Sequence, residues 1–338
     1  MSQSAPAKPQ HRLLKTLPGL AISAFFLWYT FKGISFAEVM SVRLVHPAWI
    51  AGVLGFTLAS YTLRCVRWAR MMRPVGAKFS VCARVMMTSL AANNILPLRI
   101  GDIMRVFTYA GDLGTAPSVI LSTVVLEKLL DIFVLVLLFV ATMGSIATPR
   151  LHQIAFVSLG ISGAGLLVLL LGARLLAPRV KAIFARLPQG GLMGKAEHWI
   201  GLALDATARL GVAGSLMLLV QTAVIWTCEG MIFDSSLNLL GMATDRIAPW
   251  LAVSFANLSY LIPSSPGAIG PFELAVKTSL VSHGAPEPQS ALFGLVLHVW
   301  LLVSVTGAGG VIFLLHRLRM HNHKPLLEEI ETLPTEMP

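Results

Sequence analysis

The most constraining feature of this chain is a series of long runs that contain no Asp, Glu, Lys or Arg, six of which, each of at least 16 residues, read as simple spans. A helix that crosses a membrane needs about 20 apolar residues, because the hydrocarbon core is about 30 Å thick. The runs therefore predict six membrane-spanning helices, of which the first is rather short. They occupy residues 16–31, 44–63, 132–149, 151–173, 210–228 and 289–315.

The low content of charged residues excludes a soluble domain. Only 12% of the residues are charged and the mean hydropathy is +0.75, whereas soluble domains carry about 25% charged residues. The net charge of +10 could point to nucleic acid, but no basic stretch is interleaved with aromatic residues in a soluble segment. Lys and Arg collect instead in loops on one side of a membrane. We therefore predict an all-α polytopic membrane protein that binds no nucleic acid.

Two further apolar segments do not read as simple spans: 85–98 is too short and ends in Pro-Leu-Arg, and 247–272 is interrupted by Pro and Gly. The stretches 92–102 and 256–273 share one pattern, Ala-Asn, then apolar residues, Pro, a Gly step and a carboxylate. Pro removes a backbone donor, and lipid cannot satisfy the backbone groups that a break leaves free. We therefore predict two helical hairpins, at 80–112 and 247–286, that enter the membrane and return. The alternative counts the hairpin arms as full spans and gives eight or more.

The distribution of cations sets the expected topology. With a cytoplasmic N-terminus, 20 of the 26 Lys and Arg residues fall in inside segments and five outside, and Lys128 is left unassigned. This bias favours cytoplasmic termini. The two halves, 1–150 and 151–319, then have opposite orientations and form an inverted-topology repeat. Residues 174–209 are expected to form a basic cytoplasmic loop or a surface helix, and 320–338 a loose polar tail.

The first hairpin carries candidate ligands for a lipid head group. A guanidinium binds phosphate through two parallel hydrogen bonds, and Gly lets the backbone approach closely. The alternative is that Arg99 pairs with Asp102 and simply ends the hairpin. The candidate residues are Asn93, Pro97, Arg99, Gly101, Asp102 and Arg105.

A charged group interrupts the following apolar helix at Glu127, Lys128 and Asp131. The two carboxylates are four residues apart and share one helix face. Carboxylates at membrane depth are costly and mark functional sites by default. We expect them to couple protons or to clamp Arg99 and Arg105, and the alternative is a boundary salt bridge with Lys128.

The second hairpin combines a tight turn with the start of a new helix, whose free N–H groups favour anions. Glu229 and His298 each lie alone in an apolar span, where a packed polar contact is the commoner role. The candidate residues of the hairpin are Asn257, Pro263, Ser264, Ser265, Gly267, Gly270 and Glu273.

No motif for a nucleotide, metal or cofactor is present in the sequence. Cys65, Cys82 and Cys228 form no closely spaced pair. We therefore expect no cofactor, no metal and no catalytic residue.

These motifs resemble the lysylphosphatidylglycerol synthase transmembrane-region family, also called UPF0104, over residues 15–316. The resemblance implies a bacterial inner-membrane protein whose partners are membrane lipids, with a homo-oligomer or lipid-synthesis enzymes as further partners. Members that transfer lysine carry a soluble synthase domain after the membrane part. We expect this chain, which ends at Pro338, to lack that domain and not to transfer amino acids. The residues that carry the resemblance are Arg67, Trp68, Asn93, Pro97, Arg99, Gly101, Asp102, Arg105, Glu127, Lys128, Asp131, Pro263, Gly267, Gly270 and Glu273.

The resulting expectation is a lipid transporter or flippase that moves a phospholipid or isoprenoid-type head group between leaflets. Two alternatives stay open: a membrane enzyme that acts on a lipid-linked substrate, and an accessory scaffold of a lipid-synthesis pathway.

Overall fold

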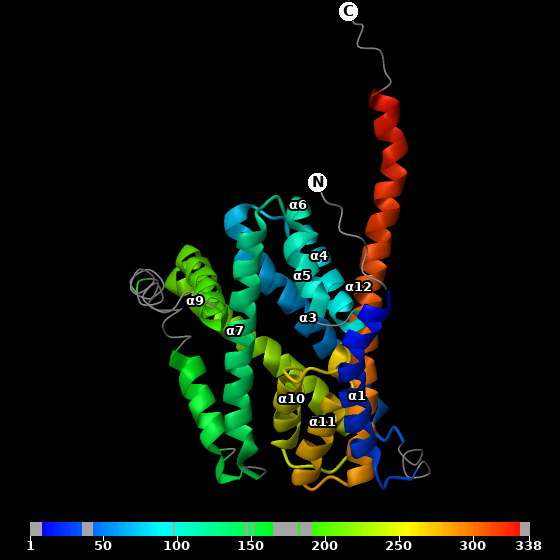
Figure 1. The fold of residues 1–338 in the computed structure, drawn as a ribbon. Coiled ribbons are helices and arrows are strands. Elements are labelled where there is room, and N and C mark those ends of the chain that lie inside the picture. Colours follow the sequence, from blue (N-terminus) through cyan, green and yellow to red (C-terminus); the bar gives the residue numbers. More distant parts are fainter. Residues whose placement is uncertain are drawn as a thin grey trace, which may run out of the picture.

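The computed structural model describes residues 9–35, 43–96, 99–145, 148–150, 152–164, 182 and 191–331. The regular structure of these residues is entirely helical (Figure 1). Residues 152–164 form an unlabelled helix after the first half of the chain. The labelled elements are α1 (Pro9–Phe31), η1 (Pro47–Trp49), α3 (Ile50–Met72), η2 (Arg73–Val75), α4 (Phe79–Ile95), α5 (Ile100–Phe107), α6 (Ala110–Leu113), α7 (Pro117–Thr142), η4 (Met143–Ser145), α9 (Gly191–Leu239), α10 (Ala248–Ser259), η5 (Pro266–Ala268), α11 (Pro271–Ser282) and α12 (Glu287–Glu331).

Helices of membrane-spanning length confirm the class. Within the described residues, three helical segments are long and apolar enough to cross a membrane: Pro47–Val75, Gly211–Leu239 and Glu287–Arg319. Large apolar side chains such as Leu58, Phe107 and Ile161 are well exposed on the surface. In water such an apolar surface would be a liability, whereas a bilayer covers it. The chain is a multi-pass membrane protein.

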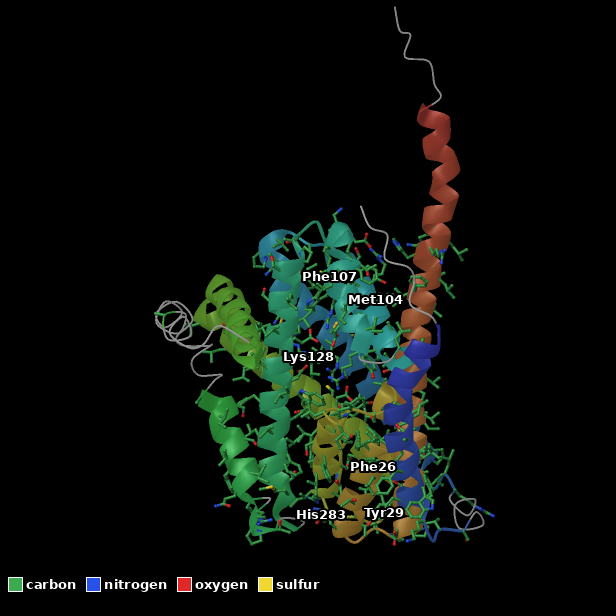
Figure 2. All side chains as sticks on the ribbon, in the orientation of Figure 1. Phe26, Tyr29, Met104, Phe107, Lys128 and His283 are labelled. Carbon is green, nitrogen blue, oxygen red and sulfur yellow. The ribbon has the colours of Figure 1, made fainter. Side chains whose placement is uncertain are left out.

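The connections between helices gather at two opposite ends of the molecule (Figure 1). At the lower end in Figure 1, the N–H groups of Val45 and His46 donate to the Leu239 carbonyl, and His283 Nδ1 lies 2.6 Å from Asp245 Oδ2. Figure 2 shows Tyr29 at this same end and Phe107 toward the other. At the upper end, ion pairing joins α4 to α6. The long helices therefore run the length of the molecule between two ends.

Two helical hairpins occupy opposite halves of this bundle. The pair α4–α5 lies in the upper half of Figure 1 and the pair α10–α11 in the lower half. At 1.5 Å per residue, the 12 residues of α10 and of α11 extend about 18 Å each, well short of the roughly 30 Å needed to cross. The eight residues of α5 extend still less. Helices of this length suit arms that enter the bundle and return, and re-entry into a membrane stays a prediction.

Each hairpin has its own apolar core. The upper core includes Trp68, Met86 and Leu126. The lower core includes Phe233, Phe272 and Phe293. The chain thus builds two packed units, one around each hairpin, and α12 passes along both (Figure 1).

Several predicted boundaries were wrong. Helix α3 continues to Met72, past the expected end at residue 63, because its charged residues find partners inside the protein. Arg64 and Arg67 therefore lie inside the bundle, although the topology count placed them in a cytoplasmic loop. Residues 191–209 are helical, as the surface-helix alternative for 174–209 allows, and they lead into the next span through a kink at Gly211. Helix α12 continues to Glu331, where a loose tail was expected.

Candidate functional site at the junction of two hairpin tips

The tips of the two hairpins meet at the middle of the molecule. The first tip follows the end of α4 at Ile95, and the second lies between Ser259 and Pro271. Arg99 Nη2 donates to the carbonyl oxygen of Tyr260 at 3.3 Å. A Cβ added to Gly267 in the second tip would lie 3.9 Å from the carbonyl oxygen of Asn94 in the first. Segments about 160 residues apart in sequence thus form one junction, which we call the hairpin junction.

Arg99 is held at this junction in an unusual backbone conformation. It precedes α5 with φ 52° and ψ 43°, in the left-handed region. That region costs about 1–2 kcal/mol for a residue with a Cβ. Its guanidinium carbon lies 5.5 Å from the centre of the Tyr260 ring, and the residue is exposed. Within the described part of the chain, no carboxylate lies within 4.0 Å of Arg99.

Asn93, Gly101 and Asp102 fix the arms of the first hairpin against each other. The Asn93 Oδ1 accepts from the backbone N–H of Asp102 at 3.1 Å, and Asn93 Nδ2 donates to Asp102 Oδ1 at 3.2 Å. A Cβ at Gly101 would overlap the Ser89 carbonyl oxygen. The glycine therefore permits close packing of α5 on α4. Pro97 lies outside the described residues.

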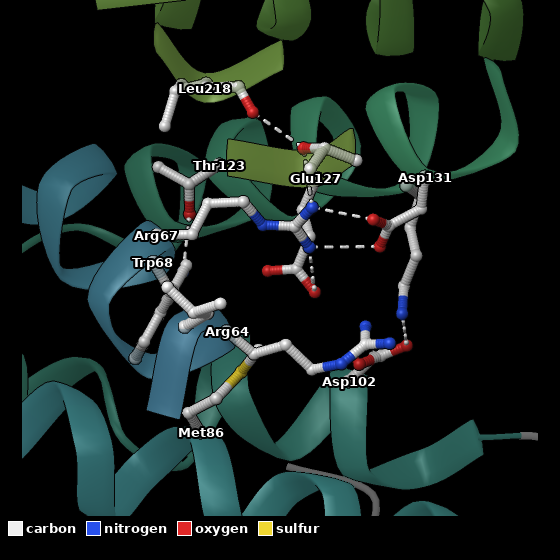
Figure 3. Close-up of polar contacts among 12 residues, drawn as sticks. Arg64, Arg67, Trp68, Met86, Asp102, Thr123, Glu127, Asp131 and Leu218 are labelled. Carbon is white, nitrogen blue, oxygen red and sulfur yellow. Dashed lines mark hydrogen bonds and ion pairs between the residues drawn. The ribbon is translucent and has the colours of Figure 1, made fainter. Parts of the chain in front are cut away.

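Beside the first tip, six charged side chains of three cations and three carboxylates form what we call the buried charge network, in which only Lys128 is as much as a third exposed (Figure 3). Arg67 binds Asp131 through two contacts, at 2.6 and 3.0 Å. Its Nη1 also donates to Thr222 Oγ1 at 2.8 Å. The network consists of Arg67, Asp102, Arg105, Glu127, Lys128 and Asp131.

Arg105 is the second hub of the buried charge network. It lies 3.1 Å from Glu127 and 2.9 Å from Asp102, and its guanidinium lies 5.1 Å from the centre of the Trp68 ring. Lys128, which reaches from α7 toward the middle of the molecule (Figure 2), binds Asp102 at 3.2 Å. The network therefore joins α3, α5 and α7, and through Thr222 it also holds α9.

The observed ion pairs can be compared with those that the sequence predicts for Arg99, Asp102, Glu127 and Lys128. Glu127 contacts Arg105, as the clamp hypothesis expected, but neither Glu127 nor Asp131 contacts Arg99 within the described residues. Asp102 pairs with Arg105 and Lys128, so the alternative pairing of Arg99 with Asp102 was wrong. The expected boundary pair of Lys128 with its neighbours in α7 is likewise replaced by Lys128 with Asp102, a partner from the hairpin.

In the second hairpin, Glu273 closes the start of α11. Its Oε2 accepts the backbone N–H of Gly270 at 2.6 Å, and its Oε1 lies 2.7 Å from His298 Nδ1. The carboxylate thus accepts one of the N–H groups at the helix N-terminus, where the sequence predicts that a ligand anion binds. Gly270 has φ 101°, and a Cβ there would lie 2.6 Å from the Ser23 carbonyl oxygen of α1.

The other candidates of the second hairpin have local roles. Asn257 Nδ2 donates to the Val253 carbonyl within α10. The Ser265 N–H donates to Ser23 Oγ at 2.9 Å and ties the tip to α1. Pro263 is exposed and Ser264 is half-buried. The structure therefore brings Arg99, Gly267 and Glu273 near the junction but turns Asn257 back onto its own helix.

Sequence reasoning missed Arg67 and Tyr260 as site residues. Arg67 was counted as a loop cation because the apolar run ends at residue 63, before the helix itself ends. The charge of Arg67 inside a helix was the signal that could have identified it. Tyr260, the tyrosine at the second tip, was overlooked among apolar neighbours. Glu229 is not alone, since it binds Arg64 at 3.0 Å and accepts from Ser60 at 2.7 Å. Among the described residues, no group of three or more His, Cys, Asp or Glu side chains is placed to hold a metal ion.

The fold and this junction define a helical multi-pass membrane protein with deeply placed, fixed charges. Residues 17–309 match the family model described as the lysylphosphatidylglycerol synthase TM region, and the chain belongs to that family. It is also similar to a protein named glycosyltransferase AglD from Haloferax volcanii, at 25% identity over 89% of this chain and 54% of that protein. The chain thus spans about half the length of this curated relative. No solved structure matches the chain.

Proposed function

We propose that this protein acts on a membrane lipid with an anionic head group, and that the head group binds at the hairpin junction. The observation that carries the proposal is that Arg99, within the described residues, has no carboxylate partner for its charge. The deep cations Arg67 and Arg105 are each bound by carboxylates. Arg99 instead rests on a backbone carbonyl and an aromatic ring, exposed, with no carboxylate nearby among the described residues.

The chemistry of Arg99 suits a phosphate. Its planar fork can give two parallel hydrogen bonds to phosphate oxygens. An uncompensated charge at membrane depth is costly and marks a functional site. Its backbone has a left-handed conformation that glycine would adopt without strain. Strain of this kind clusters at functional sites, which supports a functional role for the arginine side chain.

The proposed substrate is a lipid-linked one, such as a polyprenyl phosphate or its glycosylated form. The relative named a glycosyltransferase supports this class, because a membrane-embedded chain would meet a glycosyl group most directly on a lipid carrier. In this reading the chain binds the lipid-linked substrate for a transfer reaction. We place it in a cell membrane with cytoplasmic termini.

Movement of the lipid between leaflets is the second candidate function. The supporting observation is that the two hairpins approach from opposite ends and meet at their tips. Broken helices that meet near the membrane midplane are typical of transport sites. The inverted-repeat relation between the two halves belongs to this candidate and stays a prediction.

The first experiment measures binding. Purified protein in nanodiscs is titrated with farnesyl phosphate, and farnesol serves as the control ligand without a phosphate. We expect Arg99→Ala to lose phosphate-dependent binding and Arg99→Lys to keep part of it. Arg246→Ala, which changes an exposed arginine at the lower end, should bind normally. Equal binding of both ligands, or normal binding by Arg99→Ala, would refute the proposal.

A second experiment separates the two candidate functions. Proteoliposomes carrying a labelled polyprenyl phosphate are assayed for its movement between leaflets, and separately for glycosyl transfer with candidate sugar donors. Transfer that depends on Arg99 favours the enzyme, and leaflet exchange that depends on Arg99 without a new product favours the transporter.

A further inference from the structure

A chain of three hydrogen-bonding side chains runs from the hairpin junction into the lower core. His298 Nδ1 lies 2.7 Å from Glu273 Oε1, and His298 Nε2 lies 3.3 Å from the hydroxyl of Tyr260. The Tyr260 ring in turn lies beneath the Arg99 guanidinium. Arg99 is thus linked to the Glu273–His298 pair through a single tyrosine.

The geometry fixes which imidazole nitrogen is free to take up a proton. An ionised Glu273 can only accept a hydrogen bond, so it requires the proton of neutral His298 to sit on Nδ1. The lone pair of Nε2 then faces the Tyr260 hydroxyl. The ring of Phe272 stacks on the imidazole at 4.0 Å between centroids, which holds it in place. Glu273 and His298 are each 1% exposed.

Other titratable or charged groups around this pair are already engaged. Tyr61, Arg64 and Glu229 lie across from Tyr260 on α3 and α9, where Arg64 and Glu229 pair with each other. Lys277, one turn along α11 from Glu273, points to the α1 carbonyl of Thr30 and to Glu287. Among the described residues, no cation other than a protonated His298 contacts Glu273.

We propose that Glu273 and His298 form a proton-binding pair that is coupled through Tyr260 to occupancy of the Arg99 site. This inference rests on the function proposed above. When an anion neutralises Arg99, the carboxylate of Glu273 loses the favourable field of that cation. A proton released by the buffer acid then adds to Nε2 of His298, and the pair becomes neutral overall. By linkage, the protein takes up a proton when the anion binds, and binding strengthens as the pH falls.

The test uses a ligand whose own charge does not change with pH. Farnesyl methyl phosphate is a phosphodiester and carries one negative charge throughout the range, about pH 5–8, in which imidazoles ordinarily titrate. Calorimetric titrations in buffers of different ionisation enthalpy give the number of protons taken up on binding. His298→Asn retains a donor near the position of Nδ1 but cannot be protonated. His316→Asn changes a half-buried histidine on the same helix and is the matched control.

We expect wild type and His316→Asn to take up as much as one proton, with affinity rising up to about tenfold per unit of pH lowered while the uptake is complete. His298→Asn should bind at pH 8 as wild type does, without proton uptake or pH dependence. Proton uptake that persists in His298→Asn would overturn the inference while leaving the phosphate site intact.

If the diester fails to bind wild-type protein, the proposed function is at fault and the pair is tested without ligand. Potentiometric titration should then show that wild type binds one proton more than His298→Asn between pH 8 and pH 5. Identical titration curves would overturn the inference.

Discussion

At the scale of single residues, the buried arginines and Arg99 differ in what satisfies their charge. Arg105 is fully buried between Glu127 and Asp102, so its removal leaves Glu127 without its main partner and Asp102 with Lys128 alone. The charges themselves were predictable from sequence as costly and therefore meaningful. Their partners were not, because Arg67 and Asp131 are 64 residues apart, and hydropathy carries no information on which cation meets which carboxylate.

Arg105→Ala should lower the free energy of unfolding by about 3–5 kcal/mol, the usual cost of stranding a buried charge. The matched control is Arg84→Ala, which breaks the pair with the half-exposed Asp112 and should cost about 0–1 kcal/mol. Reversible unfolding in mixed detergent micelles measures both values. Equal losses in the two variants would show that the buried charge network contributes no more than a surface ion pair.

Arg99→Gly separates stability from binding at the junction. Glycine adopts positive φ without the steric cost that a Cβ brings, so this variant should melt at the same temperature as wild type or higher. It should nevertheless lose binding of farnesyl phosphate. A large drop in melting temperature would show that the Arg99 side chain supports the fold, contrary to a role in ligand binding.

At the scale of elements, each hairpin depends on positions where the backbones of two helices pack closely against each other. The breaks themselves were visible in the sequence, since Pro and Gly punctuate two apolar segments. The helix ends were less predictable. Helix α3 passes beyond residue 63 because α7 and α9 supply Asp131 and Thr222 to its Arg67, and such tertiary contacts override a count of apolar residues.

Gly101→Ala should disrupt the packing of α5 on α4, because the added Cβ would overlap the Ser89 carbonyl oxygen. Overpacking of this kind typically costs about 1–3 kcal/mol. Gly111→Ala is the control, since a Cβ there has no neighbour within 4 Å. Thermal unfolding of the two variants compares them directly, and an unchanged melting temperature for Gly101→Ala would contradict the observed packing.

At the scale of the whole molecule, two ends and a central junction organise the chain. The Pro and Gly breaks predicted the two hairpins, and the asymmetry of the Lys and Arg residues predicts the orientation of the ends in the membrane, which stays a prediction. The sequence could not predict that the two tips touch, because the contact of Arg99 with Tyr260 depends on how α4 and α11 each pack along α12 and how α10 packs on α11. Family membership agrees with the overall class of a helical membrane protein.

The two ends should lie on opposite sides of the membrane. Single cysteines are introduced in place of Ala116, at the upper end, and of Arg246, at the lower end, in protein without its native cysteines. Both positions are exposed. An impermeant maleimide should label the cysteine at position 116 from the cytoplasmic side only and the cysteine at position 246 from the outer side only. Labelling of both positions from one side would contradict the topology.

The most direct test of the central claim asks whether a lipid phosphate occupies the hairpin junction. A photoreactive amino acid is placed at Leu261, which is 63% exposed beside Tyr260, and, as a control, at Phe107, which is 65% exposed outside the junction. A radiolabelled polyprenyl phosphate in the bilayer is then cross-linked. We predict capture at position 261 that saturates, is displaced by unlabelled lipid phosphate and disappears with Arg99→Ala, whereas capture at position 107 does not saturate. Capture at position 261 that is non-saturable and unaffected by Arg99→Ala would contradict the account.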